Sequence, residues 1–208
     1  DAPALSRANI GISMGIAGTD VAKDASDMVL QDDNFANIVN AVEEGRKIYA
    51  NIRNFVRYQV STNVAAVALL LLASVVLQLP LPLTATQILV INILMDGPPA
   101  VALGVEGKHA NVMDRPPRPV DESLPNLIDL MLIFYLGAVM VAGSLIVYEL
   151  ALDTGEEYAR TMCFSVFIVF QLFNVMNCRS NENSVFKLGL FSNRAIYLAI
   201  AFSTILLL

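Results

Sequence analysis

The sequence predicts a bundle of membrane-spanning α-helices preceded by a short α/β segment. Of its 208 residues, 56% are hydrophobic and only 15% are charged, a balance typical of membrane proteins. Long apolar stretches recur from Tyr58 onward, whereas the first quarter of the chain alternates short apolar runs with polar turns. The formal net charge is -6, and the sequence has few clusters of basic and aromatic residues. Both observations argue against a nucleic-acid partner.

Residues 1–33 are predicted to form the C-terminal end of an α/β domain. Short apolar runs there are separated by glycine-rich and polar turns, as in alternating strands and helices. The expected elements are a strand at 10–14, a turn at 15–18, a helix from Thr19 or Asp20 to Ala25, and a strand at 28–30. Strand, helix and strand in so short a space indicate a parallel sheet.

Residues 34–57 are predicted to form a stalk helix that continues into the membrane. Asp32 or Asp33 is expected to cap it, because a carboxylate accepts hydrogen bonds from the first backbone N–H groups of a helix. No proline occurs between Asn34 and Pro80. Basic residues gather near the end of this segment and mark the cytoplasmic side of the membrane: Arg46, Lys47, Arg53 and Arg57.

Residues 58–208 are predicted to form the transmembrane domain. No charged residue occurs between Tyr58 and Met95, and because one span takes about 20 residues, this stretch indicates two helices joined at the prolines of 78–82. The expected spans are about 58–77, 84–105, 127–150, 158–178 and 195–208.

The topology that follows agrees with the distribution of positive charge. The polar segment 106–125 returns the chain to the cytoplasm, and Arg160 is then the only Lys or Arg outside. His109, the single histidine, lies in this polar segment and has no partners nearby, so it is not expected to bind a metal.

The chemically informative stretch lies in the second span, at residues 92–99. Asn92 and Asp96 are four positions apart, so their oxygens project from one face of a helix. Asp96 lies within an apolar run and has no basic residue within a turn. An unpaired carboxylate at that depth costs on the order of 2.5 to 3.5 kcal/mol on insertion scales, which favours a functional role.

The residues after Asp96 are predicted to break the helix. Pro98 and Pro99 lack the N–H groups that would bond the preceding turn, and Gly97 beside them adds freedom, so backbone carbonyls become available. Free carbonyls at membrane depth are tolerated only where they face protein or a watery cavity. A carboxylate, an amide and loosened carbonyls form an oxygen-rich site for a hard cation. The alternative is a buried Asp hydrogen-bonded to a neighbouring helix beside an ordinary proline kink.

Further amides in the spans are candidates for the same cavity. Asn63 in the first span is the third predicted metal ligand, beside Asn92 and Asp96. Gln171 and Asn174 in the fourth span are weaker candidates. All of these amides can equally bond one helix to another, which is their commoner use in membranes.

Several motifs resemble those of the P-type cation-transporting ATPases. They are DAPAL at 1–5, IGISMG at 10–15, GTDVAK at 18–23, ASD at 25–27, MDGPPA at 95–100 and DRPPR at 114–118. The first four are similar to the hinge end of that family's phosphorylation domain, and the last two to its sixth membrane helix and the loop that follows. The resemblance covers nearly the whole chain, and it makes the spans helices five to eight and the start of nine of ten.

The resemblance implies a function for the full-length protein. It implies ATP hydrolysis through an aspartyl-phosphate, with ATP and Mg²⁺ as cofactors and a cation carried across the lipid bilayer. Asp1 matches the last acid of the hinge motif, which helps to hold the phosphate and Mg²⁺ and is the predicted catalytic residue. The phosphorylated Asp, the nucleotide domain and the first four helices fall outside the sequence. The chain is therefore expected to be a C-terminal fragment, inactive without the N-terminal part of the same pump.

Departures from the family pattern narrow the predicted type. Ala66, Met95 and Gln171 stand where the two-site muscle-type calcium pumps have Glu, Thr and Glu, whereas Asn92 and Asp96 match their second site. This pattern resembles the single-site calcium/manganese pumps of the secretory-pathway type and their prokaryotic relatives. The transported ion is then expected to be Ca²⁺, with Mn²⁺ as another candidate. The membrane is expected to be a secretory-pathway membrane in a eukaryote and the plasma membrane in a prokaryote.

Other functions stay open at the level of sequence. One is a P-type pump for Na⁺, K⁺ or H⁺, which the fourth membrane helix would distinguish. Another is a secondary transporter or channel, since these also use discontinuous helices and carboxylates at the membrane midplane. The α/β segment joined to a stalk is hard to explain on that view. A regulatory remnant that transports nothing is the third alternative.

Overall fold

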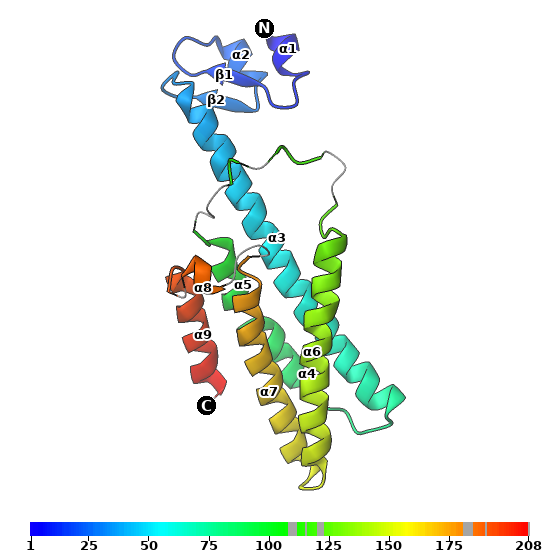
Figure 1. The fold of residues 1–208 in the computed structure, drawn as a ribbon. Coiled ribbons are helices and arrows are strands. Elements are labelled where there is room, and N and C mark those ends of the chain that lie inside the picture. The colour runs from blue at the N-terminus through cyan, green and yellow to red at the C-terminus, as the bar shows by residue number, and fades with distance from the viewer. Residues whose placement is uncertain (108–111, 115, 120–122, 181–184, 190, 208) are drawn as a thin grey trace. The chain divides into compact units, whose positions relative to one another are not determined.

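The computed structural model describes residues 1–107, 112–114, 116–119, 123–180, 185–189 and 191–207 (Figure 1). These residues divide into two compact units, Asp1–Lys47 and Ile48–Leu208. His109 lies outside the described residues.

The N-terminal unit contains a two-stranded parallel sheet with its connecting helix. Its elements are α1 (Ala2–Leu5), β1 (Ile12–Met14), α2 (Asp20–Asp24) and β2 (Met28–Leu30). The strands pair in parallel with Ile12 opposite Met28. Thr19 caps α2, because its hydroxyl accepts a hydrogen bond from the backbone N–H of Ala22 at 3.3 Å. The expected strand–helix–strand order with a parallel sheet is confirmed.

Asp33 organises the loop after β1. Its two carboxylate oxygens accept hydrogen bonds from the backbone N–H groups of Ile16 and Ala17, at 2.9 and 2.8 Å. These bonds, that from Ile16 above all, hold the pKa of Asp33 below its usual range. The backbone of Asp33 has a φ of 52°, a left-handed conformation that Asp tolerates better than most residues.

The cap of the stalk helix differs from the prediction. The backbone N–H of Ala36 donates to the side-chain oxygen of Asn34 at 3.0 Å, so Asn34 caps the helix. The prediction of Asp32 or Asp33 was wrong, since Asp33 uses its carboxylate in the preceding loop and Asp32 accepts bonds from the side chain of Asn37.

The helix α3 (Ala36–Leu71) runs without interruption into a π-helical turn, η1 (Leu72–Val76). The absence of proline between Asn34 and Pro80 predicted such a continuous helix. The remaining elements are α4 (Ala85–Val90), η2 (Ile91–Met95), α5 (Gly97–Gly104), α6 (Leu127–Leu152), α7 (Glu156–Asn177), α8 (Val185–Leu188) and α9 (Arg194–Leu207).

Four helical stretches of the described chain are long and apolar enough to cross a membrane. They are Ala36–Val76, Ala85–Gly104, Leu127–Leu152 and Glu156–Asn177, and α9 is a shorter apolar helix. Figure 1 shows α6 and α7 running side by side, joined by a short loop. α6 packs against α3 at Gly137, where a Cβ would lie in ordinary van der Waals contact with the carbonyl oxygen of Ser61, at 3.5 Å. The α-helical membrane bundle with an α/β segment before it is thus confirmed.

Two side chains fasten the turn between η1 and α4. The Tyr148 hydroxyl of α6 donates to the carbonyl oxygen of Pro80 at 2.9 Å. Nε of Arg160, on α7, donates to the carbonyl oxygen of Leu81 at 2.9 Å. The single Arg predicted outside the membrane therefore binds an exposed backbone group of the predicted outer turn.

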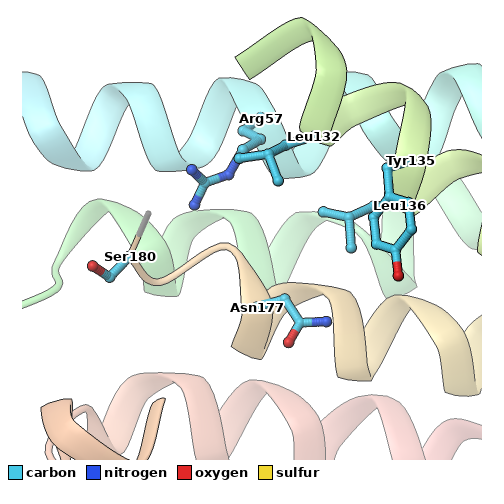
Figure 2. A pocket seen from close by; sticks show the side chains of 6 residues that line it. All are labelled: Arg57, Leu132, Tyr135, Leu136, Asn177 and Ser180. Atoms are coloured by element: carbon cyan, nitrogen blue, oxygen red, sulfur yellow. The ribbon is translucent and has the colours of Figure 1, made fainter. Parts of the chain in front are cut away.

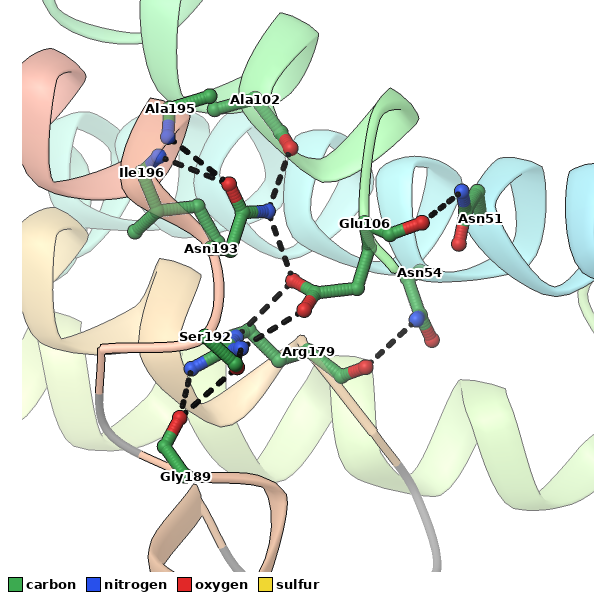
Figure 3. A network of polar contacts seen from close by, with 10 residues as sticks. All are labelled: Asn51, Asn54, Ala102, Glu106, Arg179, Gly189, Ser192, Asn193, Ala195 and Ile196. Carbon is green, nitrogen blue, oxygen red and sulfur yellow. Dashed lines mark hydrogen bonds and ion pairs between the residues drawn. The ribbon is translucent and has the colours of Figure 1, made fainter. Parts of the chain in front are cut away.

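A buried ion pair lies just after the C-terminal ends of α5 and α7 (Figure 3). Glu106 follows α5 and Arg179 follows α7, and the guanidinium contacts both carboxylate oxygens, at 2.9 and 2.7 Å. The side-chain amide of Asn193 donates to the same carboxylate at 2.9 Å, and its oxygen accepts from the first backbone N–H groups of α9. The chain segments after α5 and α7 and before α9 thus meet at one point.

The stalk helix joins the same network. Asn51 donates to the carbonyl oxygens of Gly104 and Glu106 at 3.0 and 3.1 Å, and Asn54 donates to the carbonyl oxygen of Arg179 at 2.8 Å. We call the five side chains of Asn51, Asn54, Glu106, Arg179 and Asn193 the inner clamp. All five are buried, so the clamp fixes the predicted cytoplasmic ends of four helices against one another.

Candidate cation-binding site

The second membrane stretch changes its helical geometry at the predicted break. Ile91–Met95 forms a π-helical turn, in which the N–H of Asp96 bonds the carbonyl of Ile91 at 2.8 Å. An α-helix begins again at Gly97, with prolines in its first turn. The carbonyl of Leu94 has Pro98 and Pro99 four and five positions ahead, so neither an α-type nor a π-type donor exists for it. The break is therefore a π turn followed by a new helix start, and it frees a carbonyl as expected.

Asp96 is fully buried at this break. Its carboxylate accepts a hydrogen bond from Nε2 of Gln171, on α7, at 2.8 Å, and a longer one from Nε2 of Gln59, on α3, at 3.3 Å. No Lys or Arg of the described chain forms an ion pair with it. A buried carboxylate whose partners are neutral amides is only partly compensated, and a cation at the site would complete the compensation.

Gln171 offers a further oxygen beside Asp96. Its side chain is fully buried, and Oε1 has no hydrogen-bond partner among the described residues. A buried amide oxygen without a donor is costly in an apolar core, and it is a ligand type that Ca²⁺ accepts. Gln171 is therefore a stronger candidate ligand than its position in the sequence suggested.

Gln59 is the residue that sequence reasoning missed. It lies two positions after Arg57, at the edge of the apolar stretch, where it reads as part of the polar boundary. Its helical phase relative to Asp96 depends on how α3 packs against η2, which periodicity alone does not give.

The other predicted ligands lie differently. Asn92 is on the π turn that precedes Asp96, and Asn63 is on α3, and both side chains are exposed in the structure. They remain predicted ligands. Asn174 donates to the Ser61 hydroxyl at 2.8 Å and so bonds α7 to α3, the helix-to-helix use that was its alternative.

Ala66 and Met95 lie together in an apolar core cluster of the membrane unit. Met95 is 1% exposed and Ala66 is 8% exposed, and Phe167 of α7 belongs to the same cluster. These two positions therefore contribute hydrocarbon and a thioether next to the site, and neither brings an oxygen ligand.

Asp1, the predicted catalytic residue, is exposed at the start of α1. Its side chain makes no capping hydrogen bond, so the carboxylate is available to a ligand. Among the described residues no group of three or more His, Cys, Asp or Glu side chains could hold a metal. Mg²⁺ prefers octahedral oxygen coordination, and Asp1 stays a predicted ligand whose partner oxygens are not found among the described residues.

A buried carboxylate without a cationic partner at a helix break within a membrane bundle is typical of membrane proteins that bind cations between their helices. The chain belongs to the cation transporting ATPases, since the family model described as "Cation transporting ATPase, C-terminus" matches residues 80–208. It forms the C-terminal, multi-pass membrane part characteristic of that family.

Similar proteins carry names consistent with this membership. The chain is 48% identical over 207 residues to "Calcium-transporting ATPase 1" of Schizosaccharomyces pombe, covering 99% of the chain and 23% of that protein. It is 46% identical to "Calcium-transporting ATPase type 2C member 2" of Rattus norvegicus, covering 93% of the chain and 21% of the relative. It is 46% identical to "Calcium-transporting ATPase type 2C member 1" of Homo sapiens, covering 96% and 22%. The chain thus spans about a fifth of the length of these relatives.

Proposed function

We propose that this chain supplies one side of the ion pathway in an ATP-driven pump for Ca²⁺, with Mn²⁺ as a second possible substrate. The observation that carries the proposal is Asp96, a fully buried carboxylate at a helix break that accepts hydrogen bonds from neutral amides and has no cationic partner among the described residues. The names of the similar proteins support calcium as the ion.

The chemistry of the donors supports a hard divalent ion. Asp96 contributes carboxylate oxygens, Gln171 an amide oxygen, and Leu94 a carbonyl without a helical donor. Ca²⁺ takes about 6 to 8 oxygen ligands, and so the set is completed by Asn92, by Asn63 or by helices beyond this chain. Mn²⁺ accepts the same donor types.

The energy source lies in the full-length protein. ATP with Mg²⁺ phosphorylates an aspartate outside this chain, and the Asp1 carboxylate helps to hold Mg²⁺ and the phosphate. α3 leads from the unit that carries Asp1 into the membrane unit, and it carries Gln59, one of the two amides on Asp96. In a eukaryote we place the pump in a secretory-pathway membrane, and in a prokaryote in the plasma membrane.

The substitution Asp96→Asn in the full-length pump tests this function. A neutral amide cannot replace the carboxylate in a buried dication site, so calcium activation of phosphorylation by ATP should weaken by about 100-fold or more, the effect of removing one partner of a buried charge pair. Phosphorylation from inorganic phosphate should persist, because that reaction requires an empty site.

The matched control is Asp129→Asn. Asp129 is also buried, but Nε of Arg53 pairs with it at 2.8 Å, and Asn can still accept the hydrogen bond from the N–H of Asn126. This variant should lower stability and leave calcium activation unchanged. Normal calcium activation in Asp96→Asn, or equal losses in both variants, would remove Asp96 from the ion site.

A further inference from the structure

A second buried charge of the membrane unit has no counter-ion among the described residues. Arg57, on α3, is 1% exposed and forms no ion pair with a carboxylate of the described chain. Nη2 donates to the carbonyl oxygen of Cys178 at 2.8 Å, whereas Nη1 has no hydrogen-bond partner among the described residues. Leaving a guanidinium N–H group buried without an acceptor is costly, so this nitrogen indicates a ligand that the described residues do not supply.

The position of Arg57 places it at the inner edge of the bilayer. The apolar part of the first span begins at Tyr58 and ends at the turn near Pro80, which matches the roughly 20 residues that cross the hydrocarbon core. Arg53, one turn earlier on α3, pairs with Asp129 at the start of α6. Arg57 is one turn deeper than that ion pair, at the depth where lipid phosphates meet the first carbons of the acyl chains.

A cavity of about 290 Å³ opens at this point (Figure 2). Arg57, Asn177 and Ser180 supply its polar groups, from α3 and from the end of α7. Leu132, Tyr135 and Leu136 of α6 supply its apolar wall. Figure 2 shows the guanidinium of Arg57 beside Leu132, with Tyr135 and Leu136 further along α6.

We propose that this cavity binds the phosphate headgroup of an anionic phospholipid from the inner leaflet. The unpartnered Nη1 and the neighbouring amide of Asn177 suit phosphate oxygens, because arginine donates charge-assisted hydrogen bonds to phosphate. The leucine and tyrosine side chains continue from the polar end along α6, where the acyl chains of the lipid would lie. A soluble anion would leave the apolar wall uncovered, and the cationic headgroup of a zwitterionic lipid would offset the attraction of its phosphate to Arg57.

The proposal is tested by lipid retention in the full-length protein. The protein is reconstituted in vesicles of phosphatidylglycerol mixed with phosphatidylcholine, extracted in detergent, and analysed for bound lipid by native mass spectrometry. The unaltered protein should retain phosphatidylglycerol with about a fivefold preference, the effect expected of one interfacial cation on an anionic lipid. Arg57→Gln should bring the preference to about one, and Arg57→Lys should keep most of it.

Two further variants separate this site from general surface charge and from misfolding. Lys47→Gln removes one cationic charge from α3 outside the cavity, where Lys47 pairs with Glu44, and should leave the preference unchanged. Leu132→Trp fills the apolar wall without altering charge and should reduce the retained phosphatidylglycerol several-fold. If Arg57→Gln does not fold, the lipid retention of Leu132→Trp decides whether the cavity binds phosphatidylglycerol.

Three results would overturn the proposal. The first is a preference for phosphatidylglycerol that survives Arg57→Gln, and the second is unchanged retention in folded Leu132→Trp. The third is displacement of the lipid by excess inorganic phosphate, which would show that the cavity takes the free anion.

Discussion

The three buried carboxylates of the described membrane unit are compensated in different ways. Glu106 meets the guanidinium of Arg179 through two contacts, and Asp129 meets Arg53. Asp96 accepts hydrogen bonds from the amides of Gln171 and Gln59 and has no cationic partner in the described part of the chain. Removing water from a charge costs several kcal/mol, and neutral donors return only part of that cost. Asp96 is therefore the acid at which a mobile cation gains the most from binding.

Substituting the two amides should weaken ion binding to different extents. Gln171 is buried and bonds Asp96 at 2.8 Å, whereas Gln59 is half-buried and bonds it at 3.3 Å. In the full-length pump, Gln171→Leu should raise the calcium concentration for half-maximal phosphorylation by about tenfold, as expected for losing a hydrogen bond to a charged group worth about 1.5 kcal/mol. Gln59→Leu should have a smaller effect. The reverse order would show that Gln59, and not Gln171, orients the carboxylate.

At the scale of elements, the π turn before Gly97 is the feature that exposes the site. Pro98→Ala with Pro99→Ala restores two N–H donors and lets a regular helix run through the break, since Pro costs about 3 kcal/mol in a helix interior. Calcium activation of the full-length pump should weaken by at least about tenfold, the equivalent of roughly 1.4 kcal/mol, because the Leu94 carbonyl becomes engaged.

The matched control is Pro80→Ala, in the exposed turn between the spans. It removes a proline at the opposite end of the same stretch, and the carbonyl of Pro80 that Tyr148 contacts remains. It should leave calcium activation unchanged. Equal effects of the two substitutions would show that the break serves only to let the helices pack.

The loop after β1 should depend on pH through Asp33. A folded-state pKa below the unfolded value of about 3.9 means that this carboxylate stabilises the loop fully above about pH 4, and that the contribution is lost as the pH falls through the folded-state pKa. Asp33→Asn should speed hydrogen exchange at the Ile16 and Ala17 amides at neutral pH and remove this acid dependence. Asn keeps the left-handed backbone accessible.

Asp24→Asn is the control for net charge, because the exposed Asp24 lies at the end of α2 and forms none of the loop's hydrogen bonds. Exchange at Ile16 and Ala17 should match the unaltered protein. Fast exchange in both variants would mean that overall charge, not the Asp33 carboxylate, protects the loop.

The sequence predicts those features whose cause is local. Asp96 was found because a charge in an apolar run beside Gly-Pro-Pro is informative without any partner. The Glu106–Arg179 pair joins residues 73 positions apart, and helical periodicity contains no information on which faces of different helices meet. The predicted cap of the stalk helix was wrong for the same reason, because the Asp33 carboxylate accepts hydrogen bonds from the backbone N–H groups of Ile16 and Ala17, which are distant in sequence.

At the scale of the whole molecule, the full-length pump should carry one ion per cycle. Ala66 and Met95 pack in an apolar cluster, and Gln171 adds an oxygen without a charge, so a second dication would have no carboxylate of its own among these positions. Calcium activation should then show a Hill coefficient of about one, the value for a single independent site. Radiolabelled calcium bound per phosphorylation site measures the ratio directly, and a ratio of two would refute the single-site proposal.

Adding carboxylate side chains tests the single-site proposal by a gain of calcium binding. Ala66→Glu combined with Met95→Thr and Gln171→Glu introduces oxygen ligands at the three positions. If these positions alone limit the count, the triple variant should bind more calcium per phosphorylation site and activate cooperatively. An unchanged ratio in a folded, phosphorylatable variant would place the limit in helices beyond this chain.

The second span is fixed by hydrogen bonds at both ends, and between them it contains one extra residue, that of the π turn. Tyr148 and Arg160 hold the turn before it, and the inner clamp holds the segment after Gly104. A span that is fixed in this way cannot move along its axis as a rigid body. Its only spare length is the extra residue of the π turn, which equals about 1.5 Å of rise and about 100° of rotation when a turn converts between π and α geometry. Loading and release of an ion at Asp96 should therefore proceed by a twist between the two halves of this span, with almost no axial displacement.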